Sequence, residues 1–168
     1  MYFITPPLNI VDAPADDRHT GPARHIDDIK YFILHATVGS FQSSLDWLTV
    51  NPNSVVSVHR LIDRDGAIYK LMPDSYIAYH VGSSRVGSTF NLNPLSLGIE
   101  LVNTNSGHDP YPYYQLESCA KQVAEWQSLY GELPILSHAS VDTKGKTDPR
   151  GFDWSLFYSL LINYKRSL

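Results

Sequence analysis

The run of residues from 29 to 35 constrains the fold more than any other part of this sequence. It reads Ile-Lys-Tyr-Phe-Ile-Leu-His and combines β-branched and aromatic side chains with one charged residue. A strand with one face in water alternates apolar and polar residues, whereas a strand covered on both faces is apolar throughout. The run therefore predicts a buried strand in a sheet that other elements cover.

Other apolar segments predict further strands. Residues 55–63 and 67–72 are joined through Arg64-Asp65-Gly66, and an Asp-Gly pair between two β-rich runs is a strong hairpin signal. Residues 96–103 form another apolar segment, and residues 134–137 form a brief one. We expect antiparallel pairing within the hairpin.

Three segments predict helices. Residues 113–130 carry apolar side chains at helical spacing and stop before Gly131, as in an amphipathic helix followed by a glycine. A cap at Ser43 or Ser44 predicts a short helix that ends at residue 50. Asp153 is the expected cap of a last helix that reaches about residue 164.

The order of these elements predicts an α/β fold in which helices flank a mixed central sheet. One domain is expected over residues 29–168, with residues 139–152 as a loop. Residues 1–28 are rich in Pro, Asp and Ala, and they predict an extended arm packed on this domain. For His19 and His25 in the arm we expect ordinary structural roles.

Composition narrows the possible partners. The formal net charge is −4 and no Lys or Arg run occurs, which argues against nucleic acid. No stretch approaches the roughly 20 apolar residues that span a bilayer. The N-terminus has no basic segment and its apolar run is broken by Pro6 and Pro7, so we expect synthesis in the cytoplasm without a signal peptide. Cys119 is the only cysteine, which excludes an intrachain disulfide. We also expect the protein to be a monomer.

Three polar residues stand at or just beyond the ends of predicted strands: His35, His138 and Asp148. Two imidazoles and a carboxylate are the ligands of many catalytic zinc sites, which keep a fourth position open for water. The alternative for each residue alone is a hydrogen-bonding or capping role.

Several motifs, taken in order, resemble the type 2 N-acetylmuramoyl-L-alanine amidases. They lie at residues 31–37, 57–66, 79–82, 96–100 and 138–154. The family includes muropeptide-recycling amidases, phage endolysins and animal peptidoglycan recognition proteins. The resemblance covers residues 29 to 160, and it implies their fold and hydrolysis of the amide bond between N-acetylmuramic acid and L-alanine in peptidoglycan.

The resemblance also implies a zinc site and its ligands. His138, Lys146 and Asp148 have the spacing of the recycling amidases, and with His35 they match the family's metal site. Many endolysins and recognition proteins carry Cys where this chain has Asp148. The chain is therefore similar to the branch that uses Asp.

Glu100 and Lys146 are the expected catalytic residues. A Glu within an apolar strand is costly unless it faces a polar cleft, and the resemblance implies that Glu100 moves the proton. Lys146, two residues before Asp148, is expected to stabilise the oxyanion. The alternatives are a solvent-facing carboxylate and a loop lysine. Val58 replaces a tyrosine common in endolysins, so Glu100 is expected to act without tyrosine assistance.

His59 and His80 are predicted substrate-binding residues. For His59 a place in the core is an equal alternative, whereas His80 matches a family histidine near the groove. His108 is given a structural role.

A non-catalytic peptidoglycan-binding module is the main competing function, but every metal-ligand position is filled. The sequence contains no His-Glu-x-x-His motif, which would indicate a zinc peptidase of another family. Two roles stay open: an endolysin released by a holin, which is expected first, and a cytoplasmic recycling enzyme.

Overall fold

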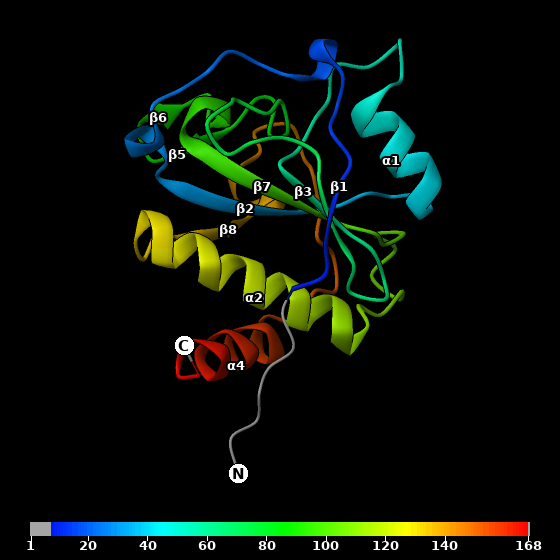
Figure 1. Cartoon of the computed structure of the whole chain (residues 1–168), viewed down its shortest axis with the longest axis vertical. Coiled ribbons are helices and arrows are strands. Elements are labelled where there is room, and N and C mark those ends of the chain that lie inside the picture. The colour runs from blue at the N-terminus through cyan, green and yellow to red at the C-terminus, as the bar shows by residue number, and fades with distance from the viewer. Residues whose placement is uncertain (1–7, 168) are drawn as a thin grey trace.

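A mixed six-stranded sheet forms the centre of the fold (Figure 1). The computed structural model describes residues 8–167. Within them the strands are β1 (Ile10–Asp12), β2 (Tyr31–Ala36), β3 (Arg60–Ile62), β4 (Ile68–Lys70), β5 (Arg85–Val86), β6 (Thr89–Phe90), β7 (Ser96–Leu101) and β8 (Ile135–Ser137). The sheet order is β1-β4-β3-β7-β2-β8, and β5 and β6 form a separate hairpin.

Most neighbouring strands of the sheet run parallel. β7 pairs in parallel with β2 and β3, and β8 pairs in parallel with β2. The antiparallel pair β3–β4 is the predicted hairpin, turned at Gly66 with φ +91. The carboxyl ends of β7, β2 and β8 therefore meet at one edge of the sheet, which is where α/β proteins place their binding groups.

Helices cover both faces of this sheet. They are α1 (Phe41–Thr49), α2 (Tyr113–Tyr130), α3 (His138–Val141) and α4 (Trp154–Lys165), with 3-10 turns at Asp17–His19, Ile26–Asp28 and Asn93–Leu95. Figure 1 shows α2 and α4 together below the sheet and α1 on its other side. This arrangement confirms the predicted α/β class with flanking helices.

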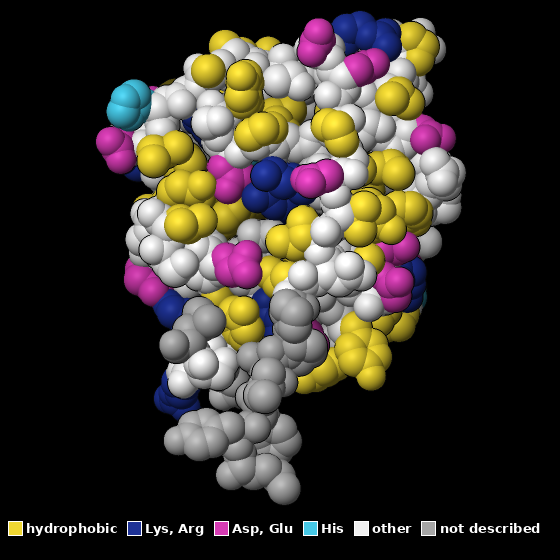
Figure 2. Space-filling model, viewed as in Figure 1, with side chains coloured by type: hydrophobic (Ala, Val, Ile, Leu, Met, Phe, Trp, Pro, Cys, Tyr) yellow, Lys and Arg dark blue, Asp and Glu magenta, His cyan; other side chains and the backbone are white. Residues whose placement is uncertain are grey.

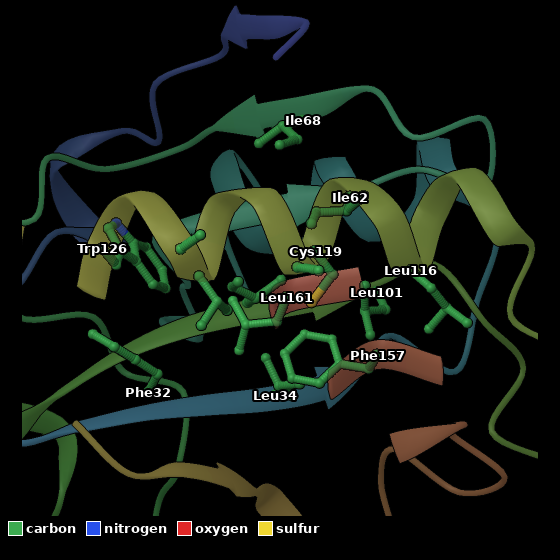
Figure 3. Close-up of a cluster of buried hydrophobic side chains, with 14 of the residues drawn as sticks. Phe32, Leu34, Ile62, Ile68, Leu101, Leu116, Cys119, Trp126, Phe157 and Leu161 are labelled. Carbon is green, nitrogen blue, oxygen red and sulfur yellow. The ribbon is translucent and has the colours of Figure 1, made fainter. Parts of the chain in front are cut away.

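The main hydrophobic core lies between the sheet and the helix pair α2 and α4. Phe32 and Leu34 from β2 meet Trp126 and Cys119 from α2 and Phe157 from α4 (Figure 3). All five side chains are buried. The boundaries of α2 are those predicted, and Gly131 ends the helix with φ +92.

Smaller apolar clusters occupy the opposite face. Leu48 of α1 packs with Val58 and Leu61, and Ile33 of β2 packs with Val81. The predicted cap of α1 is wrong by one helical turn, because Ser40 Oγ accepts from the Ser43 amide. The helix therefore begins earlier than the sequence pattern indicated.

Residues 8–28 run along the domain and contribute a strand that the sequence did not predict. Ile10–Asp12 pairs in parallel with Ile68–Lys70, and His19 is buried with Nδ1 2.8 Å from the Val56 carbonyl. Residues 1–7 of the predicted arm lie outside the described residues. The hairpin β5–β6 and the short helix α3 also arise in segments read as loops or left unassigned.

The surface mixes charge types. Figure 2 shows basic and acidic side chains interspersed with hydrophobic ones on the face seen in Figure 1. Across residues 8–167, no helix combines the length and apolar character that crossing a membrane requires.

Candidate metal centre and groove

The register of two parallel ladders brings chemistry-bearing residues to one edge of the sheet. His35 on β2 stands opposite Glu100 on β7. β8 aligns Ser137 with Leu34, and His138 is the next residue along the chain. Residues far apart in sequence thus become neighbours, because the three strands end at the same level.

Asp148 completes a cluster with the two histidines. One ligand atom from each of His35, His138 and Asp148 lies within 4.8 Å of the others. Asp148 Oδ2 is 3.0 Å from His138 Nδ1 and 3.5 Å from His35 Nδ1. All three residues are buried. The structure therefore brings together the three predicted ligands, although His35 precedes the other two by more than a hundred residues.

The electrostatics of the cluster suit a cation. Burial lowers the pKa of His35 to about 4, and the nearby Asp148 carboxylate opposes this change. Burial raises the pKa of Asp148, but the contacts with His138 and His35 outweigh it and hold that pKa well below its ordinary value. A neutral imidazole and an ionised carboxylate are the forms that bind metals.

Glu100 occupies the groove beside this cluster. Burial raises the pKa of its carboxyl to about 8, with Asp148 adding to the rise and Lys146 opposing it. Its Oε2 atom is buried and has no hydrogen-bond partner among the described residues. A divalent cation close by would favour the ionised form and so lower this pKa.

Lys146 is carried by a loop that folds around Asp142. Asp142 Oδ2 accepts from the Lys146 amide at 2.9 Å and from the Lys144 amide at 2.6 Å. These backbone hydrogen bonds, with that of Lys146 the strongest, lower the pKa of Asp142. Asp142 Oδ1 also lies 4.0 Å from His138 Nε2. Sequence reasoning missed Asp142, although its place four residues after His138 on a helical turn was a signal.

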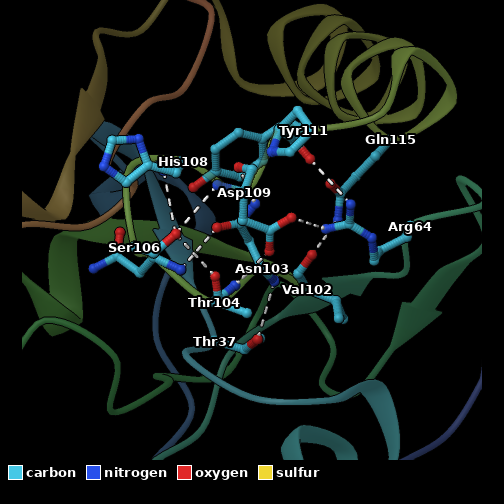
Figure 4. Close-up of polar contacts among 12 residues, drawn as sticks. Thr37, Arg64, Val102, Asn103, Thr104, Ser106, His108, Asp109, Tyr111 and Gln115 are labelled. Carbon is cyan, nitrogen blue, oxygen red and sulfur yellow. Dashed lines mark hydrogen bonds and ion pairs between the residues drawn. The ribbon is translucent and has the colours of Figure 1, made fainter.

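A second loop braces the segment that carries Asp148. Asn105 Oδ1 accepts from the Arg150 amide at 2.7 Å, and Asn105 Nδ2 donates to Thr147 Oγ1 at 3.2 Å. The loop that holds Asn105 is itself closed by polar contacts around Asn103 and Asp109 (Figure 4). Asp148 is therefore held between two anchored neighbours.

The cluster opens into a groove of about 780 Å³. Its walls include Thr37, Trp47, Val56, Tyr79, Ser83, Glu100, Asp142, Lys144 and Lys146, together with His80, His138 and Asp148. Trp47 is 46% exposed and was not singled out from the sequence. A groove lined by both aromatic and charged side chains can bind a molecule that is part sugar and part peptide.

The two predicted substrate-binding histidines lie in different places. His59 is fully buried, with Nδ1 accepting from the Gly98 amide at 3.1 Å and Nε2 3.0 Å from the Tyr76 carbonyl. Its nitrogens are thus engaged within the core, which leaves no surface for substrate and corrects the expected contact. His80 lines the groove but is 6% exposed.

The donor set fits zinc. Ligand atoms about 2.05 Å from a tetrahedral zinc are separated by roughly 3.4 Å, and the Asp148 oxygen lies 3.0 and 3.5 Å from its two imidazole neighbours. The unpartnered Glu100 oxygen is a second sign that a polar group belongs in this part of the groove.

Sequence comparisons show which proteins the chain is similar to. The model of a family described as N-acetylmuramoyl-L-alanine amidase matches residues 26–151. The chain is 37% identical over 112 residues to 1,6-anhydro-N-acetylmuramyl-L-alanine amidase AmpD of Enterobacter cloacae, covering 63% of this chain and 57% of that protein. It is 28% identical over 137 residues to N-acetylmuramoyl-L-alanine amidase AmiD of Escherichia coli K12, covering 72% and 49%. The chain thus spans about half the length of these relatives.

Solved structures agree in fold. A crystal structure of a selenomethionine AmpD derivative has a TM-score of 0.77 and 25% identity, covering 91% of this chain and 94% of that one. A complex of AmiD from E. coli with the substrate anhydro-N-acetylmuramic acid-L-Ala-D-gamma-Glu-L-Lys has a TM-score of 0.71 and 27% identity, covering 79% and 57%. These likenesses confirm the fold that the ordered motifs predicted.

Proposed function

The chain belongs to the N-acetylmuramoyl-L-alanine amidase family, and from that membership we propose that it hydrolyses the amide bond between N-acetylmuramic acid and L-alanine. One observation carries the proposal: His35, His138 and Asp148 meet within 4.8 Å in the groove that also contains Glu100. A non-catalytic binding module would not require a complete donor set next to a buried, unpartnered carboxylate.

In this proposal the three converging residues hold a zinc ion. When bound, zinc lowers the pKa of water to about 7 and polarises a carbonyl. His35, His138 and Asp148 orient the site from strand ends that are fixed by the sheet, so little reorganisation accompanies the reaction.

The protein's own groups move the proton. Glu100 accepts a proton from the attacking water as the new carbon–oxygen bond forms, and it returns this proton to the nitrogen as the carbon–nitrogen bond breaks. Lys146, presented by the loop around Asp142, donates to the oxygen that gains charge. The products are a lactyl sugar and a peptide with a free amino terminus.

Soluble fragments are the substrate form that we favour. The most similar curated relative reported above is named for the 1,6-anhydro muramyl group, and the AmiD complex contains an anhydro-muropeptide. These names support the recycling role that the sequence left open as the alternative. The endolysin role, which was expected first, stays open as the alternative.

The test compares two substrates with and without metal. The purified chain is incubated with a soluble anhydro-muropeptide and with intact sacculi, before and after treatment with a chelator, and released peptide is quantified. We expect cleavage of the soluble fragment, its loss on chelation and its return with added zinc. Binding without peptide release would overturn the amidase assignment, whereas efficient solubilisation of sacculi would restore the endolysin role.

A further inference from the structure

His80 is tied into the protein through both of its ring nitrogens. Its Nδ1 lies 2.9 Å from His35 Nε2, and its Nε2 lies 3.1 Å from Ser96 Oγ. Ser96 Oγ in turn lies 2.7 Å from the carbonyl oxygen of Leu92. These contacts form a chain of hydrogen bonds that leads from the backbone to His35.

The carbonyl at the end of this chain determines the direction of every hydrogen bond in it. A carbonyl oxygen only accepts, so the single hydroxyl proton of Ser96 points to Leu92, and Ser96 Oγ accepts from His80 Nε2–H. A neutral imidazole carries one N–H, so His80 Nδ1 is bare and accepts from His35 Nε2–H. The remaining nitrogen of His35, Nδ1, then offers its lone pair toward Asp148, 3.5 Å away.

The surroundings of His80 hold it in this orientation. The amides of His80 and Val81 both donate to Asn93 Oδ1, at 3.1 and 3.0 Å. On the strand beneath, a Cβ added at Gly98 would lie 2.6 Å from His80 Nδ1. Only a glycine therefore lets the imidazole lie flat against β7, within reach of His35.

We infer that His80 is a positioning residue that selects the tautomer and orientation of His35, and that it does not act as the substrate contact expected from the sequence. The inference rests on the proposed function, because it takes His35 as a metal ligand. Groups that accept the second N–H of a metal-binding histidine orient the ring and raise its basicity. Their loss lowers metal affinity by about 10- to 100-fold.

Two amide substitutions separate this role from simple packing. In His80→Asn the side-chain oxygen takes about the position of Nδ1, so it can still accept from His35. In His80→Gln the amide reaches further, toward the position of Nε2, and the acceptor beside His35 is lost. Zinc affinity of the purified chain is measured by competition with a chromophoric chelator. We expect His80→Gln and His80→Ala to bind zinc about 10- to 100-fold more weakly, and His80→Asn to stay close to the wild type.

His59 provides the matched control. It is an equally buried imidazole whose ring centroid lies 5.9 Å from that of His80, but it makes no hydrogen bond to His35. His59→Asn keeps an acceptor for the Gly98 amide, and we expect unchanged zinc affinity. Thermal melting of each metal-free variant reports any general loss of folding.

Several outcomes would overturn the inference. Equal zinc affinity in all His80 variants would do so, as would His80→Asn binding as weakly as His80→Gln. A raised KM with unchanged zinc affinity would return His80 to substrate binding. In each of these cases the wild type still binds zinc and the proposed function stands, whereas a wild-type chain that binds no zinc would overturn both.

Discussion

The two faces of the central sheet use the same strands for different purposes. On β2, Phe32 and Leu34 point to the helices α2 and α4 and are fully buried among apolar side chains. The alternate residues Ile33 and His35 point to the opposite face, where His35 meets Asp148. Because strand side chains alternate, one residue of shift would exchange the two sets.

The two faces differ in the property that a substitution is expected to change. The helix-covered face is close-packed and gains stability from apolar burial. The groove face contains ionisable groups whose pKa values are displaced by burial, and Glu100 Oε2 there lacks a partner among the described residues. We therefore expect substitutions on the first face to change stability and those on the second to change chemistry.

The largest effect is expected for His138→Ala. Removal of one of three donors should abolish zinc binding, and with it all measurable turnover, while the apolar core stays intact. Metal content and peptide release are measured on the same preparation. His108→Ala, at an exposed histidine, should change neither quantity. Turnover that survives in His138→Ala would remove this residue from the site.

Glu100→Gln should separate chemistry from metal binding. The amide cannot accept the proton, so kcat should fall by about 10²- to 10⁴-fold, while zinc content and KM stay near wild type. Steady-state kinetics with a soluble muropeptide measure both parameters. Glu132→Gln, which removes the ion-pair partner of Lys165, is the matched control and should retain full kcat. Full activity in Glu100→Gln would assign the base elsewhere.

Phe157→Ala tests the other face. Phe157 is fully buried against Phe152, with ring centroids 5.5 Å apart. Its truncation should lower the free energy of unfolding by about 3 to 5 kcal/mol. Urea denaturation measures this loss. The zinc affinity of the folded variant should stay unchanged. A selective loss of zinc without loss of stability would contradict the division between the faces.

The smallest effect is expected in the pH dependence of the stability of the metal-free protein. The pKa of Glu100 is raised to about 8 in the folded chain, from an ordinary value of 4.5. The folded state therefore binds the Glu100 proton more tightly than the unfolded state does. The stability that this protonation contributes is complete below pH 4.5 and is lost as pH rises toward 8. With a chelator present, the free energy of unfolding of the wild type should fall relative to that of Glu100→Gln over that range. Parallel pH profiles of the two proteins would contradict the raised pKa.

Local signals in the sequence predicted the regular elements well. Gly131 marked the end of α2, Asp65-Gly66 marked the hairpin, and Asp153 caps α4 through the Leu156 amide. β1 was missed because its three residues are exposed and acquire strand geometry only by pairing with β4. The hairpin β5–β6 was also missed, although Gly87-Ser88 between two short extended segments was a usable turn signal.

The site was predictable in part. Spacing and resemblance pointed to His35, His138 and Asp148, but neither predicts a distance, which comes from the register of β2 with its neighbours. The engagement of both His59 nitrogens could not be foreseen, because its partners come from segments far away in the chain. Such contacts depend on tertiary packing, which no local pattern encodes.

The strand β8 has three residues and lies at the end of the sheet, with β2 as its sheet neighbour. His138 follows it directly, so one donor of the cluster depends on the outermost strand. Strand ends open locally at a lower free energy than the whole domain. Fraying of β8 would displace His138, and with it weaken the proposed metal site, while α2 and α4 remain folded. On gentle warming, metal escape should therefore precede the loss of helical signal.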